Sequence, residues 1–376
     1  MAGIYVHIPF CKKRCYYCDF YKCFDTSLTA HYIESLLKEA EIRKEYLEES
    51  QIDTIYFGGG TPSVLQVEQL DKIKGKIIKL YPCSQKLELT IELNPDDTSL
   101  DYYTKLKDSG FNRISLGVQS WDDDILKFLN RRHDSAQAAK SLEEARKCGF
   151  DNISVDLIYG IPHTKTRQWE EDLDITFKSG VEHLSAYHLT IEDGTMFHKM
   201  FLNGNLRECD EQESEKQFNI LLEQSAKFGY QQYEISNFCR ANYYSKHNTN
   251  YWKQVPYIGL GPSSHSFNGN SRQWNVSDIN IYTENLNKNI IPCEEEKLDD
   301  KTKYNEYIMT SLRTMWGVDL DEVERKHNKE TRDYLLNISN RFVTYGMMEI
   351  IDKRTLLLTN QGKLISDNII SELMMV

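Results

Sequence analysis

The first 190 residues alternate short β-rich runs with longer amphipathic segments, and this repeat restricts the fold more than any other feature. Six runs have the composition of strands: 3–10, 54–59, 87–94, 113–120, 153–160 and 183–190. Five segments between them carry apolar residues at helical spacing: 28–48, 64–80, 98–109, 135–148 and 167–179. Strands separated by helices pair in parallel through right-handed crossovers. The pattern predicts an α/β fold, a partial (β/α)6 TIM-like barrel, because the eight units of a full barrel are not found.

Beyond about residue 196 the repeat is lost. We expect one more helix over 211–228, and the charged run 294–303 indicates a solvated linker or a helix start. The end of the chain predicts a small, mostly helical, winged-helix-like domain with a short strand, a turn at Gly362 and a closing helix. We therefore expect three parts: a barrel over 1–235, a connecting region over 236–300 and a helical domain over 301–376.

Composition limits the class of protein. With 376 residues, 40% hydrophobic and 27% charged, the chain is typical of a globular protein. It has no apolar run of about 18 residues and no secretory signal, so we expect a cytoplasmic protein without a transmembrane segment. Its nine cysteines then favour metal binding or free thiols over disulfides. The formal charge of −12 argues against a nucleic-acid partner.

Three of those cysteines, Cys11, Cys15 and Cys18, form a C-x3-C-x2-C cluster directly after the first predicted strand. Loops at the carboxyl ends of barrel strands build active sites, so the cluster lies where chemistry is expected. Three thiolates can hold three irons of a [4Fe–4S] cube and leave the fourth iron open to a ligand. A zinc site is the alternative, with Cys23 or a distant histidine as the fourth ligand.

Further candidates follow the later strands. The turn GGGTP (58–62) can bring backbone N–H groups close to an anion, although many glycine-rich turns are only tight turns. Ionisable or amide side chains inside apolar strands are costly unless they are paired or used, and a structural hydrogen bond or ion pair is the plain alternative for each. Their convergence on one barrel mouth favours a polar pocket lined by Glu92, Gln119, Arg131 and Asp156.

Together these segments resemble a known superfamily. The sequences YVHIPFC-x3-C-x2-C, GGGTP, ELNP, GVQS and DLIYG occur in order on consecutive predicted units. They are similar to the radical S-adenosylmethionine (SAM) proteins of the HemN/HemW branch, and the resemblance covers nearly the whole chain. The branch contains oxygen-independent coproporphyrinogen III oxidases, which act in porphyrin biosynthesis, and haem chaperones.

The resemblance implies a set of cofactors. Cys11, Cys15 and Cys18 would hold a [4Fe–4S] cluster whose open iron chelates SAM. One electron from the cluster, from a donor that the sequence does not identify, would cleave SAM to methionine and a 5′-deoxyadenosyl radical. The positions that match SAM contacts are Tyr5, Tyr17, Gly59, Gly60, Thr61, Glu92, Gln119, Arg131 and Asp156. In the oxidases, several of the positions that match Gln119, Arg131 and Asp156 contact a second SAM.

Two departures separate the chain from the oxidases (coproporphyrinogen dehydrogenases). Phe20 occupies the position of their fourth motif cysteine, and only Met-Ala-Gly precedes the first strand where the oxidases carry an extension. The stretch HNTNYW (247–252) instead matches the H-N-x-x-Y-W motif of the haem chaperones. That match implies His247 as an axial haem ligand, with Tyr251 and Trp252 against the porphyrin. His265 is a competing ligand, and Cys239 is a more remote one.

We therefore predict a haem chaperone that carries haem as cargo and delivers it to acceptor haemoproteins such as respiratory cytochromes. We expect it in the cytoplasm, or peripherally at the membrane through its acceptors, and a homodimer is compatible with this expectation. The alternative is an oxygen-independent coproporphyrinogen III oxidase, in which the radical abstracts hydrogen from propionate side chains with loss of carbon dioxide. A third reading, a radical SAM enzyme acting on RNA or another substrate, is disfavoured by the acidic composition.

Overall fold

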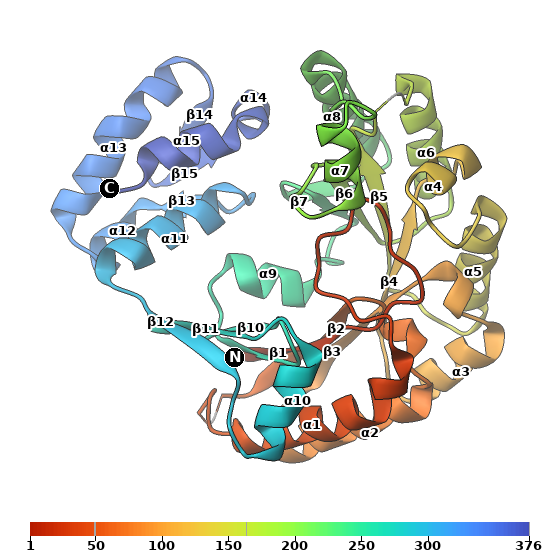
Figure 1. The fold of residues 1–376 in the computed structure, drawn as a ribbon. Coiled ribbons are helices and arrows are strands. Elements are labelled where there is room, and N and C mark those ends of the chain that lie inside the picture. Colours follow the sequence, from red (N-terminus) through yellow and green to blue (C-terminus); the bar gives the residue numbers. More distant parts are fainter. Residues whose placement is uncertain (49, 163, 376) are drawn as a thin grey trace.

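A computed structural model describes residues 1–48, 50–162 and 164–375, and it confirms the predicted α/β fold (Figure 1). Six parallel strands lie side by side in chain order, as the repeat predicts. Their bounds are β1 (Ala2–Ile8), β2 (Ile52–Gly59), β3 (Cys83–Leu93), β4 (Arg113–Gln119), β5 (Ile153–Tyr159) and β6 (His183–His188).

Helices cover the outer face of these strands. They are α1 (Thr29–Ile42), α2 (Val67–Leu80), α3 (Leu100–Asp108), α5 (Ser135–Lys147) and α6 (Thr166–Lys178), together with α4 (Asp123–Phe128), which the sequence pattern does not predict. Helix α1 ends at Ile42 rather than at residue 48, because Arg43 leaves helical geometry and its side chain turns inward. There the guanidinium pairs with Glu39 at 3.0 Å and donates to the carbonyl of Gly259 at 3.1 Å.

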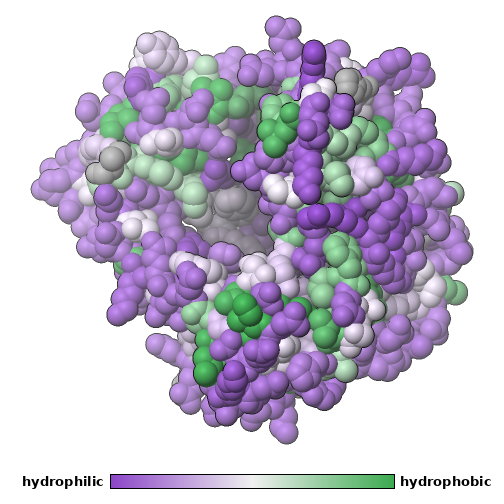
Figure 2. Space-filling model, in the orientation of Figure 1, coloured by the Kyte–Doolittle hydropathy of each residue, from purple (hydrophilic) through white to green (hydrophobic). Residues whose placement is uncertain are grey.

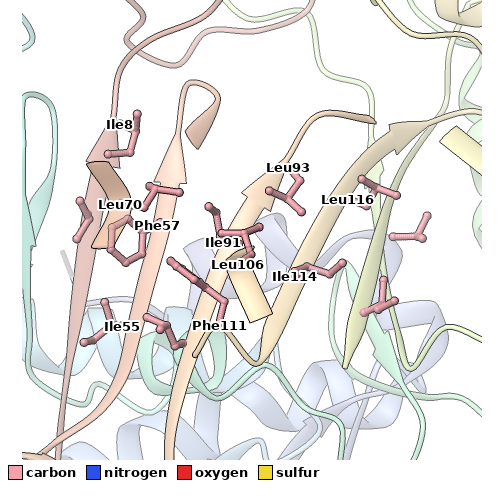
Figure 3. Packing of buried hydrophobic residues seen from close by; sticks show 14 of the residues in the cluster. Ile8, Ile55, Phe57, Leu70, Ile91, Leu93, Leu106, Phe111, Ile114 and Leu116 are labelled. Atoms are coloured by element: carbon pink, nitrogen blue, oxygen red, sulfur yellow. The ribbon is translucent and has the colours of Figure 1, made fainter. Parts of the chain in front are cut away.

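The strands have two chemically different faces, because successive side chains point to opposite sides of a sheet. The row that faces the helices is apolar, and Figure 3 shows part of it, from Ile8 on β1 to Leu116 on β4. The opposite, inner row is polar and contains Tyr5, His7, Tyr56, Glu92, Arg113, Ser115, Asp156 and His183. Burial of the apolar row against the helices therefore places the polar row around an interior space.

The region after residue 196 extends the same sheet at both edges. Strands β8 (Asn237–Cys239) and β7 (Gln231–Glu234) continue it beyond β6. On the other side, β9 (Tyr257–Leu260) pairs in parallel with β1 and is followed by β10 (His265–Phe267), β11 (Ser271–Asn275) and β12 (Cys293–Lys297). The result is a twelve-stranded sheet whose first and last strands do not pair with each other in the described residues. The charged run 294–303 is not a linker, because it forms most of β12 and then the start of a helix.

Four helices accompany these strands: α7 (Met196–Leu202), α8 (Glu211–Lys227), α9 (Lys246–Trp252) and α10 (Ile279–Asn287). The bounds of α8 agree with the predicted 211–228. In Figure 1, α9 lies on the inner side of β1 to β3, opposite α1 and α2. Its first turn is fixed by the buried carboxylate of Glu88 on β3, which accepts the backbone N–H groups of Lys246 and His247, each at 3.0 Å. An acidic group is well placed there, at the positive end of the helix dipole.

The C-terminal part has its own hydrophobic core and a three-stranded sheet. Its elements are α11 (Asp300–Leu312), β13 (Val318–Asp319), α12 (Leu320–Lys326), α13 (Lys329–Thr344), β14 (Met348–Ile351), β15 (Thr355–Leu358), α14 (Asn360–Leu364) and α15 (Ser366–Leu373). The predicted turn at Gly362 is wrong: Gly362 lies in α14, where a Cβ would overlap the carbonyl of Met347. None of the described helices is long and apolar enough to cross a membrane.

Candidate functional site

The loop after β1 and the carboxyl ends of the strands enclose a cavity of about 440 Å³. We call it the first cavity. All three cysteines of the cluster line it, because the loop that carries them folds back over the strand ends. It is also lined by eight of the nine residues matched to SAM contacts: Tyr17, Gly59, Gly60, Thr61, Glu92, Gln119, Arg131 and Asp156. The ninth, Tyr5, lies elsewhere.

The three thiols are free and share this wall. Cys11 is buried with its Sγ 3.4 Å from Thr61 Oγ1, and Arg131 Nη1 donates to Cys15 Sγ at 3.4 Å. Burial raises the pKa of the Cys11 thiol to about 11, so binding of iron would be needed to hold it as a thiolate. No three His, Cys, Asp or Glu side chains in the described ranges converge on a single ion. A [4Fe–4S] cube binds each cysteine at a different iron, so its ligands need not converge, and the donor set fits.

The glycine turn is explained largely by packing. Gly59 has φ +111°, and a Cβ there would lie 2.7 Å from the ring of His7, while one on Gly60 would lie 2.8 Å from the backbone of Pro9. The N–H of Gly59 donates to Glu92 Oε2 at 3.1 Å rather than pointing freely into the cavity. Close approach of neighbouring protein atoms therefore accounts for glycine at both positions, and ligand contact there stays a prediction.

Two polar side chains beside the cysteines are held in unusual ways. Gln119 has φ +71° at a bulge in the β4–β5 ladder, a strained conformation for a residue other than glycine. Arg131 donates from Nη2 to the carbonyl of Gly117 at 2.8 Å and to Asn94, but its buried Nε has no partner. A buried donor without an acceptor is rare in native proteins. The unpaired Nε of Arg131 therefore fits a ligand carboxylate in the first cavity.

A second cavity, of about 630 Å³, adjoins the first. It lies between the inner strand faces, α9 and the start of the C-terminal part, where Thr310 of α11 reaches its wall. Figure 2 shows this face of the molecule hollowed at its centre, between the C-terminal part and the strands. The two cavities have five lining residues in common: Phe20, Glu92, Ser115, Asp156 and Tyr187. They are therefore two compartments of one interior.

Two carboxyl groups mark the junction. Glu92 accepts the hydroxyl of Tyr56 at 2.8 Å, and Asp156 accepts that of Ser115 at 3.0 Å. Burial is the main cause that raises the pKa of Glu92 to about 7 and also raises that of Asp156. At neutral pH Glu92 is therefore divided between its acid and carboxylate forms. It can accept from, or donate to, a ligand on either side.

The residues predicted to contact haem line the second cavity: His247, Tyr251 and Trp252 from α9, together with the competing ligand His265 from β10. Tyr5, predicted to contact SAM, also lies here, with its ring 6.4 Å from that of His247. Cys239 lines neither cavity and is buried in β8.

His247 is firmly held. Its Nδ1 lies 2.8 Å from Thr54 Oγ1, its Nε2 lies 2.9 Å from the hydroxyl of Tyr251, and its ring stacks on Tyr56 at 5.1 Å. Burial lowers the pKa of His247 to about 3, so the ring is neutral. Neutral imidazole is the form that binds iron. A metal could bind Nε2 only by replacing the contact with Tyr251.

Sequence reasoning missed several residues of the second cavity: His7, Tyr56, Arg113, His183 and Tyr187. Except for His7 and Tyr187, these residues lie along the strands rather than at the carboxyl ends, where site residues are expected. The signal that could have found them is the period-two alternation, which puts each of them on the same face as Glu92 or Asp156.

Comparisons with known proteins agree with this architecture. The model of the radical SAM superfamily matches residues 5–175. The protein named heme chaperone HemW of Bacillus subtilis is 32% identical over 372 residues, which cover 98% of both chains. The Lactococcus lactis protein of the same name is 32% identical and covers 99% of this chain and 97% of its own. The Escherichia coli coproporphyrinogen III oxidase HemN superposes with a TM-score of 0.84 at 22% identity, covering 99% of this chain and 89% of that one, which shows the shared fold.

Three findings together define a radical SAM protein: the parallel strands, the cysteine loop over their carboxyl ends, and the match to the superfamily's sequence model. Within that superfamily the similarity to the bacterial relatives runs the full length of the chain. The chain belongs to the HemW family.

Proposed function

We propose that the protein is a haem chaperone that binds haem in the second cavity and passes it to acceptor haemoproteins, such as respiratory cytochromes. The observation that carries this proposal is the full-length similarity to relatives named heme chaperones. The second cavity supports it, because its volume lies within the range of roughly 300–1,000 Å³ that is usual for cofactor sites. Its wall includes His247, Asn248, Tyr251 and Trp252, the four specified positions of the HNTNYW motif.

The first cavity would hold the resident cofactors. In the proposal Cys11, Cys15 and Cys18 would hold a [4Fe–4S] cluster, and SAM would bind beside it in the first cavity. When bound, these groups supply one-electron chemistry. The protein's own contribution is orientation: Arg131 Nε can donate to a carboxylate oxygen, and Glu92 can accept an N–H of the amino group.

In the second cavity the neutral ring of His247 is the proposed axial ligand. Binding would exchange the hydroxyl of Tyr251 for iron, while Thr54 keeps hold of Nδ1 and fixes the ring. Tyr251 and Trp252 would then contact the porphyrin, as aromatic side chains do in apolar pockets. His265 is the competing ligand because it is exposed and lines the same cavity.

The remaining assignments are also proposals. We place the protein in the cytoplasm, with peripheral contact to membrane-bound acceptors, and leave a homodimer as a compatible assembly. We keep the division at residues 235 and 300 as proposed domain boundaries, although strands β8 to β12, which follow residue 235, belong to the same sheet as β1 to β7.

Anaerobic titration with hemin tests the proposal. The full chain, with its cluster reconstituted, should develop a Soret band that saturates at one haem per chain. His247→Ala should shift or lose the band, whereas His265→Ala should leave it unchanged. Loss in His265→Ala alone would move the ligand to β10. No saturable band in the wild-type protein would contradict the proposal.

Coproporphyrinogen III oxidation is the second candidate, favoured by the presence of Gln119, Arg131 and Asp156 together in the first cavity. Phe20 argues against it, since it replaces a cysteine of the oxidase motif. An anaerobic assay with coproporphyrinogen III, SAM and a reductant separates the two functions. Decarboxylated product at catalytic turnover would support the oxidase.

A further inference from the structure

A buried cation without a partner lies in the wall of the second cavity. Arg113 is the first residue of β4, its side chain is only 2% exposed, and it lines the cavity. Its Nε has no hydrogen-bond partner, and it forms no ion pair with any described residue. Buried guanidinium groups are normally matched by an acceptor, because removing the charge from water is costly. This arrangement points to an acceptor that comes with a ligand.

The other basic groups of the second cavity are either already paired or uncharged. Arg272 is already paired with Glu306 through two contacts of 2.5 and 2.9 Å. The four histidines of the wall are neutral at pH 7, because burial lowers the pKa of each of them: His7, His183, His247 and His265. Among the described lining residues, Arg113 is therefore the positive charge that remains without a direct partner.

The two carboxyl groups of the junction do not neutralise Arg113 by direct contact. Glu92 is satisfied by Tyr56 and Gly59, and Asp156 by Ser115, while no oxygen of either lies within ion-pair distance of the guanidinium. They are close enough for the charge of Arg113 to lower the pKa of both, against the larger effect of burial. The same charge lowers the pKa of His247, so the guanidinium and the proposed iron ligand influence the same space.

We propose that Arg113 binds a carboxylate of the ligand that occupies the second cavity. The inference rests on the proposed function, under which this carboxylate is a propionate of haem. The planar guanidinium can bind both oxygens of a carboxylate, which adds orientation to affinity. The porphyrin would thus enter with one propionate directed at β4, and Arg113 would set its orientation relative to His247.

Haem dimethyl ester tests this inference, since it keeps the iron and the ring but lacks both carboxylates. Charge-assisted hydrogen bonds of this kind typically correspond to roughly tenfold to hundredfold in affinity. We expect the wild-type protein to bind hemin more tightly than the ester by about that factor. Arg113→Met should remove the preference, and Arg113→Lys should retain part of it. The Soret titration measures the affinity of each of the three proteins for both ligands.

A matched control is Arg146→Met, which removes a guanidinium that is paired with Glu182 at 2.9 Å outside both cavities and should leave the preference for hemin intact. Equal affinity of the wild-type protein for hemin and the ester would overturn the inference without requiring any variant to fold. A preference that persists in Arg113→Met would overturn it as well. Failure of the wild-type protein to bind either ligand would instead contradict the proposed haem site itself.

Discussion

Replacing His247 should destabilise the protein even when no haem is present. His247→Ala removes two hydrogen bonds, leaves the hydroxyl of Thr54 buried without its partner, and removes the ring that stacks on Tyr56. A buried hydrogen bond contributes about 1 kcal/mol and an aromatic pair about 0.5–1.5 kcal/mol. We therefore expect the free energy of unfolding to fall by about 3 kcal/mol.

Urea denaturation of the haem-free protein, followed by circular dichroism, measures this change. His265→Ala is the control, because its exposed ring makes no hydrogen bond to a described residue and only stacks on Trp274 at 6.3 Å, so it should change stability by about 1 kcal/mol at most. An unfolding midpoint of His247→Ala equal to that of the wild-type protein would refute the reasoning. The ring would then not be held as the structure places it.

Three further predictions concern the first cavity and its junction. Gly59→Ala should lower the free energy of unfolding by about 2–3 kcal/mol, because φ is +111° and the new Cβ would meet the ring of His7. The control is Gly75→Ala in α2, where an added Cβ has no neighbouring atom within 4 Å and should be neutral or stabilising. Equal effects of the two variants in urea denaturation would contradict the account. Glu92, whose pKa of about 7 in the folded state exceeds the usual 4.5, binds its proton more tightly when folded. Its contribution to stability is therefore present below about pH 4.5 and is lost as the pH rises through 7, by about 3 kcal/mol in total. The difference in unfolding free energy between wild type and Glu92→Gln between pH 5 and 8 measures it, and parallel profiles would disprove it. Cys15→Ser should reduce iron content and visible iron–sulfur absorption after reconstitution, whereas Cys148→Ser, outside both cavities, should not; equal iron in the two variants would exclude Cys15 as a ligand.

The six parallel strands could be predicted because each run of β-branched and apolar residues is separated from the next by a segment of helical period. Glu92 and Gln119, near the ends of β3 and β4, line one cavity for the same reason, since carboxyl ends of parallel strands share one edge. The period-two alternation of side chains along each strand also implies which of them point inward, and Arg113 could have been found from this alternation.

The rest of the sheet could not be read in this way. Strands β9 to β12 are three to five residues long, too short for a period to be detected, and they are specified by tertiary contacts. The pair of Glu39 and Arg43, buried between α1 and β9, is one such contact. Likewise, HNTNYW identifies a motif but not its environment. Only the fold shows that both nitrogens of His247 are engaged and that Tyr5 lies beside it rather than beside the cysteines.

Transfer of haem tests the central proposal most directly. The protein, loaded with one equivalent of hemin and freed of excess, is mixed anaerobically with a haem-free cytochrome, and the Soret band of the acceptor is followed with time. We predict transfer that is faster than release of haem to a non-acceptor protein such as albumin at the same concentration. Haem that stays with the chain, or leaves for both proteins at one common rate, would contradict the proposed function.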